Sequence, residues 1–81
     1  MQKIDLAKAR KIFGEALRSK RESANETIDE VAARAGLAPS RIIQIEGGEL
    51  NFHLLTLLKL SRGYQVGADK LLECLAIANY K

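Results

Sequence analysis

Apolar residues recur at three- and four-residue steps along most of the 81-residue chain, the spacing that places them on one face of an α-helix. The spacing predicts a long first helix over about residues 5–22, with its apolar side formed by Leu6, Ala9, Phe13, Ala16 and Leu17. It predicts two more helices over about residues 54–62 and 68–79, the earlier one with its apolar set at Leu54, Leu57, Leu58 and Leu60. The Gly63–Gly67 stretch is interpreted as a break between them.

Residues 27–46 contain the signals of two short helices joined by a tight turn. Thr27 and Glu30 form a capping box, in which each side chain accepts a hydrogen bond from the other residue's amide. Gly36 lies where the first short helix must end, because a left-handed terminal residue is easiest for glycine. Pro39 suits the first position of the second helix, where its missing N–H costs nothing. Burial of Ile42 and Ile45 would leave an outward edge formed by Ser40, Arg41, Ile43 and Gln44. This is the helix-turn-helix pattern.

The pattern T-x-x-E-V-A-x-R-A-G-L-x-x-S-x-I-x-x-I-E-x-G, from Thr27 to Gly48, resembles the Cro/λ-repressor type of helix-turn-helix, or XRE family. The resemblance continues back to L-R-x-x-R at residues 17–21 and forward through L-L-T-L-L-K-L at residues 54–60. It implies a five-helix, all-α, λ-repressor-like DNA-binding domain, a single domain over residues 1–81. Its second and third helices would form the helix-turn-helix.

The resemblance also implies which residues meet DNA. The base-reading positions of the family match Pro39, Ser40 and Gln44, with Arg41 and Ile43 beside them. Phosphates would be held at the amide ends of the second and fourth helices, near Thr27, Ile28, Asn51 and His53. Arg34 would add positive charge. In the family a structural salt bridge joins the first and third helices, and Arg21 and Glu46 match its two partners.

Apolar residues extend farther around the last predicted helix than one core-facing stripe requires. Together with Leu55 and Tyr64 they would leave surplus apolar surface, which marks an interface. We expect a homodimer with two-fold symmetry, which would place two recognition helices about 34 Å apart in successive major grooves. The expected interface residues are Tyr64, Leu71, Leu72, Leu75, Ile77 and Ala78. The alternative is that Ile77 and Ala78 pack back onto the first helix.

Charge is unevenly distributed along the chain. Residues 1–21 contain seven Lys or Arg and two acidic residues, a net charge of +5, whereas the remaining six Lys or Arg and eight acidic residues give −2. The basic segment fits a polyanion partner such as double-stranded DNA, or it forms a solvated helix face.

The composition excludes other classes of protein. No apolar run is long enough to span a membrane, and the N-terminus lacks a signal-type segment. One cysteine, Cys74, permits no internal disulfide, which fits a reducing cytoplasm, and we expect it to be buried. The family resemblance implies a bacterial or phage-encoded protein. With one histidine and no phosphate-binding glycine loop, the sequence predicts no catalytic residues, no metal site, no cofactor and no small-molecule ligand.

The expected DNA-facing surface departs from the family pattern. The family usually has glutamine at the position of Ile28 and basic residues near those of Gly47, Glu49 and Leu50. Glu49 should repel phosphate. These departures predict modest DNA affinity, or a shift of phosphate contact toward the basic first helix. They also leave open an alternative function, a helix-turn-helix scaffold for protein contact, such as an antitoxin-like partner, with weak DNA binding.

Overall fold

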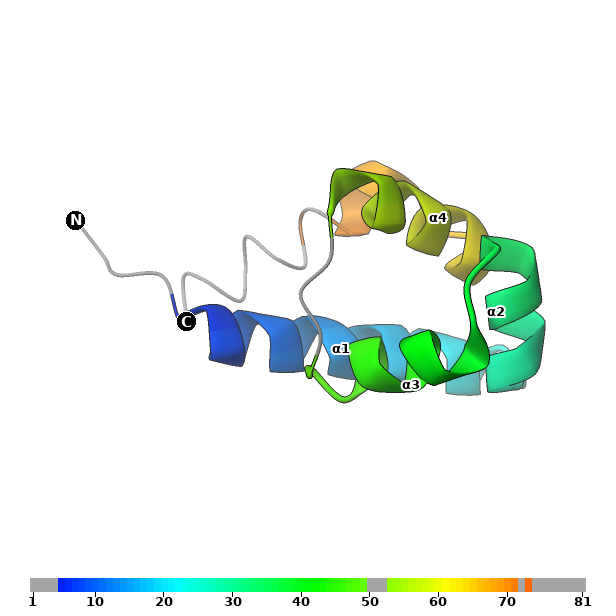
Figure 1. Ribbon diagram of the computed structural model, residues 1–81, viewed down its shortest axis with the longest axis horizontal. Coiled ribbons are helices and arrows are strands. Elements are labelled where there is room, and N and C mark those ends of the chain that lie inside the picture. The colour runs from blue at the N-terminus through cyan, green and yellow to red at the C-terminus, as the bar shows by residue number, and fades with distance from the viewer. Residues whose placement is uncertain (1–4, 50–52, 72, 74–81) are drawn as a thin grey trace.

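The structure, a computed structural model, describes residues 5–49, 53–71 and 73 of the 81-residue chain. Helix α1 spans Leu6–Ser23, α2 spans Ile28–Ala35, α3 spans Pro39–Glu46 and α4 spans Leu54–Tyr64 (Figure 1). A fifth helix begins at Ala68, and its end lies outside the described residues. The described part of the chain contains helices and no strand, so the predicted all-α fold is confirmed.

Local sequence signals set the helix ends. The Asp5 side chain accepts a hydrogen bond from the Lys8 amide at 3.0 Å and so caps the start of α1. Thr27 and Glu30 form both hydrogen bonds of the capping box at the start of α2. Gly36 ends α2 with a φ of 73°, in the left-handed region that favours glycine. Each of these ends depends on residues close together in the sequence.

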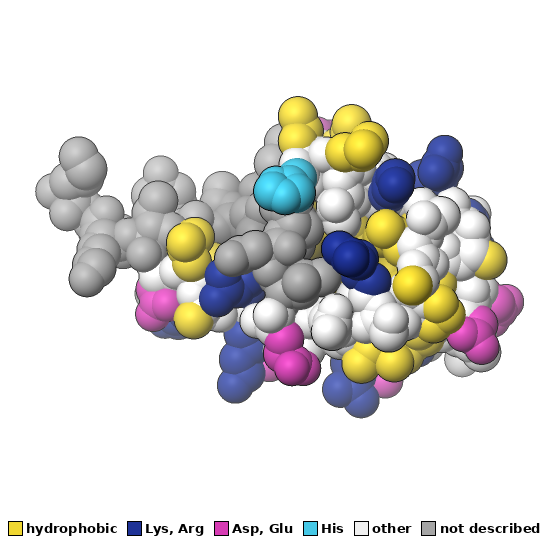
Figure 2. Space-filling view, in the orientation of Figure 1, with side chains coloured by type: hydrophobic (Ala, Val, Ile, Leu, Met, Phe, Trp, Pro, Cys, Tyr) yellow, Lys and Arg dark blue, Asp and Glu magenta, His cyan; other side chains and the backbone are white. Residues whose placement is uncertain are grey.

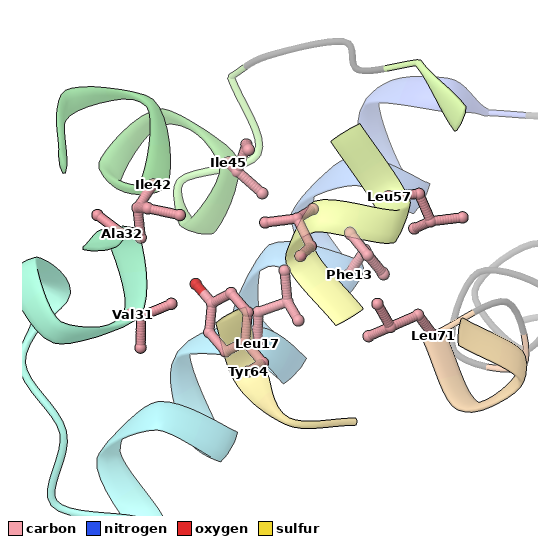
Figure 3. Close-up of a cluster of buried hydrophobic side chains, with 10 residues drawn as sticks. Phe13, Leu17, Val31, Ala32, Ile42, Ile45, Leu57, Tyr64 and Leu71 are labelled. Atoms are coloured by element: carbon pink, nitrogen blue, oxygen red, sulfur yellow. The ribbon is translucent and has the colours of Figure 1, made fainter. Parts of the chain in front are cut away.

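The four helices enclose one aliphatic core. Figure 1 shows the long helix α1 along one side of the molecule, with α3 against it and α4 on the opposite side. Helix α2 packs on both α3 and α4, and α1 packs mainly on α3. The side chains that fill the space between them (Figure 3) are Phe13, Leu17, Val31, Ala32, Ile42, Ile45, Leu57, Leu60, Tyr64 and Leu71.

Gly14 allows α1 and α3 to approach each other closely. A Cβ atom at this position would lie 2.5 Å from the carbonyl oxygen of Glu46 and would also clash with that of Ile45. The end of α3 therefore rests directly on the backbone of α1. This contact fixes the distance between the end of α3 and α1.

The buried face of α4 differs from the sequence-based expectation. Leu57, Leu60 and Tyr64 point into the core, at the spacing of one helix face. Leu54 and Leu58, which were expected in the apolar set, are 70% and 50% exposed. That expectation was wrong because the leucines of this segment fall on two overlapping faces, and only packing against α2 selects between them.

Helix α4 also continues through Gly63, where a break was predicted. A Cβ at Gly63 would lie 2.6 Å from the Cβ of Ala35, so the glycine provides space for α2 rather than a helix end. The helix ends two residues later, where Gln65 adopts a φ of 56°.

A buried polar cluster joins α1, α3 and α4. Arg21 donates two parallel hydrogen bonds to Glu46, from Nε to Oε2 at 2.9 Å and from Nη2 to Oε1 at 3.0 Å. The Tyr64 hydroxyl donates to Glu46 Oε2 at 2.6 Å. Burial, together with this hydrogen bond, raises the pKa of Tyr64, and the hydrogen bond to Glu46 raises the pKa of Arg21. The family resemblance implied the Arg21–Glu46 pair, which the structure contains, but not its third member.

Two residues of the expected dimer interface, Tyr64 and Leu71, are buried within the protomer. Tyr64 is only 2% exposed and its hydroxyl is engaged within the protomer. Leu71 is 3% exposed and belongs to the core. Neither side chain has surface to offer a second copy. The other four expected interface residues, Leu72, Leu75, Ile77 and Ala78, and also Cys74, lie outside the described residues.

Candidate nucleic-acid interface

Helix α3 presents one exposed edge to solvent. Ile42 and Ile45 are buried against the core, which fixes the rotation of the helix about its axis. The residues left exposed are Pro39, Ser40, Arg41, Ile43 and Gln44. Figure 2 shows the face of the molecule on which α3 lies, with the only histidine above it. Thus all five residues expected to meet bases share one uncovered strip of surface.

The start of α3 leaves one donor available. Pro39 has no N–H, and the amides of Arg41 and Ile42 both donate to the carbonyl of Ala38, at 2.9 and 3.3 Å. The Ser40 amide belongs to the first turn, where a helix offers no backbone acceptor. Ala38 supplies no side-chain cap. Ser40 can therefore donate through its amide as well as its hydroxyl.

The start of α2 is poorly suited to phosphate, contrary to expectation. The Thr27 amide already donates to Glu30 Oε1 at 2.9 Å. This hydrogen bond and the one from the Thr27 hydroxyl hold the pKa of Glu30 below its ordinary value, so the carboxylate is charged. Asp29 adds a second carboxylate to the same turn, and Ile28 is half-buried against the core. Two negative charges there oppose a phosphate, so this helix end does not favour the contact expected near Thr27 and Ile28.

The start of α4 is better suited to phosphate. Its N-cap residue, His53, is exposed and makes no side-chain hydrogen bond to the helix, and the first turn contains no acidic residue. The first amides of a helix have no backbone acceptor within it, and the positive end of the helix dipole lies there. Asn51, the other residue expected at this position, lies outside the described residues.

Two arginines near the motif are engaged in holding the fold together. Arg34 donates to Glu26 Oε2 at 2.6 Å and to the Gly63 carbonyl at 2.9 Å. Arg62 donates to the Ala35 carbonyl at 3.4 Å, at the end of α2. Arg34 therefore has a structural role, and two of its nitrogen atoms are already engaged within the fold. This link could not be predicted from the sequence, because Glu26 and Gly63 are 8 and 29 positions away from Arg34.

The described residues contain neither a metal-binding cluster nor a membrane-spanning helix. Among the described residues, no three His, Cys, Asp or Glu side chains come close enough together to hold a metal ion. None of the helices in this part of the chain is both long and apolar enough to cross a membrane.

The chain is similar to known regulatory proteins. A family model described as a helix-turn-helix domain matches residues 12–73. The restriction-modification controller protein C.AhdI from Aeromonas hydrophila has a similar structure, with a TM-score of 0.71 and 28% sequence identity over 75% of this chain and 92% of that one.

Two further solved structures share the fold. The clp gene regulator ClgR from C. glutamicum has a TM-score of 0.73 and 23% identity, covering 86% of this chain and 91% of its own. A point mutant of the restriction-modification controller protein C.Esp1396I has a TM-score of 0.74 and 20% identity, covering 100% of this chain and 98% of its own. No curated protein sequence matches the chain.

These comparisons agree with the geometry. The match to the helix-turn-helix family covers α2, α3 and the helices that support them. Together with the regulator neighbours it confirms the resemblance to the Cro/λ-repressor type and indicates a DNA-binding regulator rather than an enzyme. The chain belongs to the family of helix-turn-helix domains.

Proposed function

We propose that this protein is a sequence-specific transcriptional regulator that binds double-stranded DNA as a homodimer on a pseudo-palindromic operator. It would act in the cytoplasm and repress transcription by occupying that operator. One observation carries the proposal. The edge of α3 formed by Pro39, Ser40, Arg41, Ile43 and Gln44 is exposed, while Ile42 and Ile45 hold the opposite face of the helix in the core.

The residues on this edge suit the chemistry of the major groove. The Gln44 amide group can form two hydrogen bonds with adenine, and Arg41 can do the same with guanine. Ser40 can donate to a base or to a phosphate. Ile43, 53% exposed, offers apolar contact to a thymine methyl group, as does Pro39. The α4 amides beside His53 would then hold a phosphate and set the orientation of α3 in the groove.

The first test selects duplexes from a random pool at two salt concentrations. A regulator enriches one motif with two-fold symmetry, because each copy reads one half-site. Gln44→Ala should then relax the preference at one position of that motif, costing about 1–3 kcal/mol of discrimination. Ser19→Ala, an exposed change on α1, is the matched control. A pool without enrichment would refute sequence-specific binding.

The homodimer needs an apolar surface that the protomer leaves uncovered. Helix α4 provides one: Leu54, Leu55 and Leu58 are 70%, 63% and 50% exposed. Figure 2 shows exposed hydrophobic side chains at the upper edge of the molecule, the edge along which α4 runs in Figure 1. This patch takes the place of Tyr64 and Leu71 in the proposed interface. Sedimentation should give a dimer for the wild-type protein and a monomer for Leu58→Glu. A wild-type monomer at high micromolar concentration would refute the dimer.

The same patch also favours a second candidate function, a scaffold that binds another protein and has weak affinity for DNA. The acidic start of α2 and the exposed Glu49 support this candidate, because both oppose phosphate. The duplex selection separates the two, since a scaffold would enrich no motif.

A further inference from the structure

The end of α3 lies against the first half of α1 at Lys11. A Cβ built on Gly48 would lie 2.7 Å from the Lys11 Cα and 3.2 Å from its Cβ. One helical turn further along α1, Gly14 touches the last carbonyl groups of α3. The Lys11 side chain therefore leaves α1 directly beside the turn that ends the recognition helix.

Lys11 is exposed and forms no ion pair with any described residue. Four arginines around α3 have hydrogen-bond or ion-pair partners within the protein, which limits their contact with phosphate. These partnerships are Arg18 with Glu22, Arg21 with Glu46, Arg34 with Glu26, and Arg62 with the Ala35 carbonyl. On α3 itself, Arg41 is the one basic residue. Figure 2 shows basic side chains projecting from the lower edge of the face on which α3 lies.

The end of α3 needs a cation if the helix enters the major groove. An eight-residue helix is about 12 Å long, close to the width of the groove, so groups at its end reach the phosphates that border the groove. The local charge there is otherwise negative. The final carbonyls carry the negative end of the helix dipole, and Glu49 is exposed at the same turn. Without a cation nearby, this end would repel the DNA backbone.

We infer that Lys11 of α1 binds a DNA phosphate beside the end of α3, and so supplies a contact that the α3 turn itself lacks. This inference rests on the proposed function. It adds α1 to the DNA-binding surface, because the Gly48 turn brings Lys11 to the border of the groove. The backbone is contacted on both sides of α3, by the α4 amides near His53 and by Lys11.

The salt dependence of binding tests this assignment. Each phosphate contact contributes about 0.9 to the slope of log affinity against log salt. Lys11→Gln should lower the slope by that amount for each bound copy. When the salt is raised from 50 to 200 mM, the ratio of the wild-type affinity to the affinity of the variant should then decrease about 3.5-fold for each bound copy. The measurement is fluorescence anisotropy of an enriched duplex. Lys11→Arg, which keeps the charge, should retain the wild-type slope.

Lys20→Gln is the matched control on the same helix. Lys20 is also exposed, but it borders an apolar hollow lined by Val66, Lys70 and Leu71, on a side of α1 that packs away from α3. The salt slope of Lys20→Gln should equal that of the wild type. An unchanged slope for Lys11→Gln, or an equal decrease for Lys20→Gln, would overturn the assignment. A wild-type protein that binds no duplex would refute the proposed function as well.

A lysine beside the end of a helix also interacts favourably with the helix dipole. That role would appear as a lower unfolding midpoint for Lys11→Gln, with the salt slope unchanged. The two measurements therefore distinguish a structural lysine from one that binds phosphate, and only a decreased slope supports the inference.

Discussion

Tyr64→Phe tests the polar cluster beneath the recognition helix with the least change in shape. The substitution removes only the hydroxyl that donates to Glu46 at 2.6 Å. It leaves both hydrogen bonds from Arg21 to Glu46 in place. A hydrogen bond to a charged group contributes about 1.5–3 kcal/mol. Because Tyr64 is 2% exposed, water cannot replace the lost donor. We expect the free energy of unfolding at pH 7 to fall by about 2 kcal/mol.

The difference in unfolding free energy between the wild type and Tyr64→Phe should decrease as the pH rises. The pKa of Tyr64 is raised in the folded state by burial and by Glu46, whereas in the unfolded chain it is about 10. The folded state therefore retains a proton that the unfolded state loses as the pH rises above 10. The contribution of Tyr64 is fully present below pH 10 and is lost above it. At pH 11 the loss is about 1.4 kcal/mol, so the advantage of the wild type should nearly vanish between pH 11 and 12.

The assay is urea unfolding followed by far-ultraviolet circular dichroism at pH 7, 9, 10 and 11. Both proteins carry Tyr80→Phe, so that they differ only in the presence of Tyr64, the other of the two tyrosines in the chain. Lysine titration is common to both and cancels in the difference. A stability difference that stays constant up to pH 11 would show that the Tyr64 hydroxyl is not a buried proton donor to Glu46, and the reasoning would fail.

Two further substitutions test the contacts around α3. Gly14→Ala should lower the free energy of unfolding by about 1–3 kcal/mol, although alanine is the better helix former, because its Cβ would strike the end of α3. Urea unfolding measures this change, with Ser19→Ala as control, and equal stability would disprove the close contact. Glu49→Gln should tighten binding to an enriched duplex by about 0.5–1 kcal/mol per copy, since it removes an anion near phosphate. Fluorescence anisotropy measures the affinity, with Asp69→Asn as the control variant. Weaker binding by Glu49→Gln would contradict the predicted repulsion between Glu49 and phosphate.

The features that could be predicted from the sequence depend on neighbouring residues. The capping box at Thr27, the left-handed Gly36 and the positive φ of 56° at Asn25 each follow from the chemistry of one turn. The boundaries of α1 and α3 likewise fall within one residue of the prediction. The exposed edge of α3 was also predictable, because the three-residue spacing of Ile42 and Ile45 specifies which side is buried.

Features that depend on distant contacts could not be predicted in this way. Gly63 looked like a break in its helix, but it provides space for α2, as Gly14 provides space for α3. Tyr64 looked like an interface residue because its partner, Glu46, is 18 positions away. The leucines of α4 fit either of two helix faces, and packing of α4 against α2 decides between them. In each case the deciding atom belongs to another helix.

The orientation of α3 depends on these distant contacts. An isolated helix of eight residues is unstable in water, so the groups around α3 must both form it and direct its edge. Glu46 does this at one end, where hydrogen bonds from Arg21 and Tyr64 connect it to α1 and α4.

The region before α3 is held by a second set of contacts. Arg21 also donates to the Glu26 carbonyl at 3.1 Å, and the Glu26 carboxylate binds Arg34, which in turn reaches Gly63 on α4. One chain of hydrogen bonds thus extends from the end of α3 to the start of α2 and back to α4. It passes through the Glu26 carboxylate, and so gives the arginine of α2 a structural role. Arg41 on α3 and Lys11 on α1 take no part in this chain of hydrogen bonds, and they are the cations that we propose for contact with DNA.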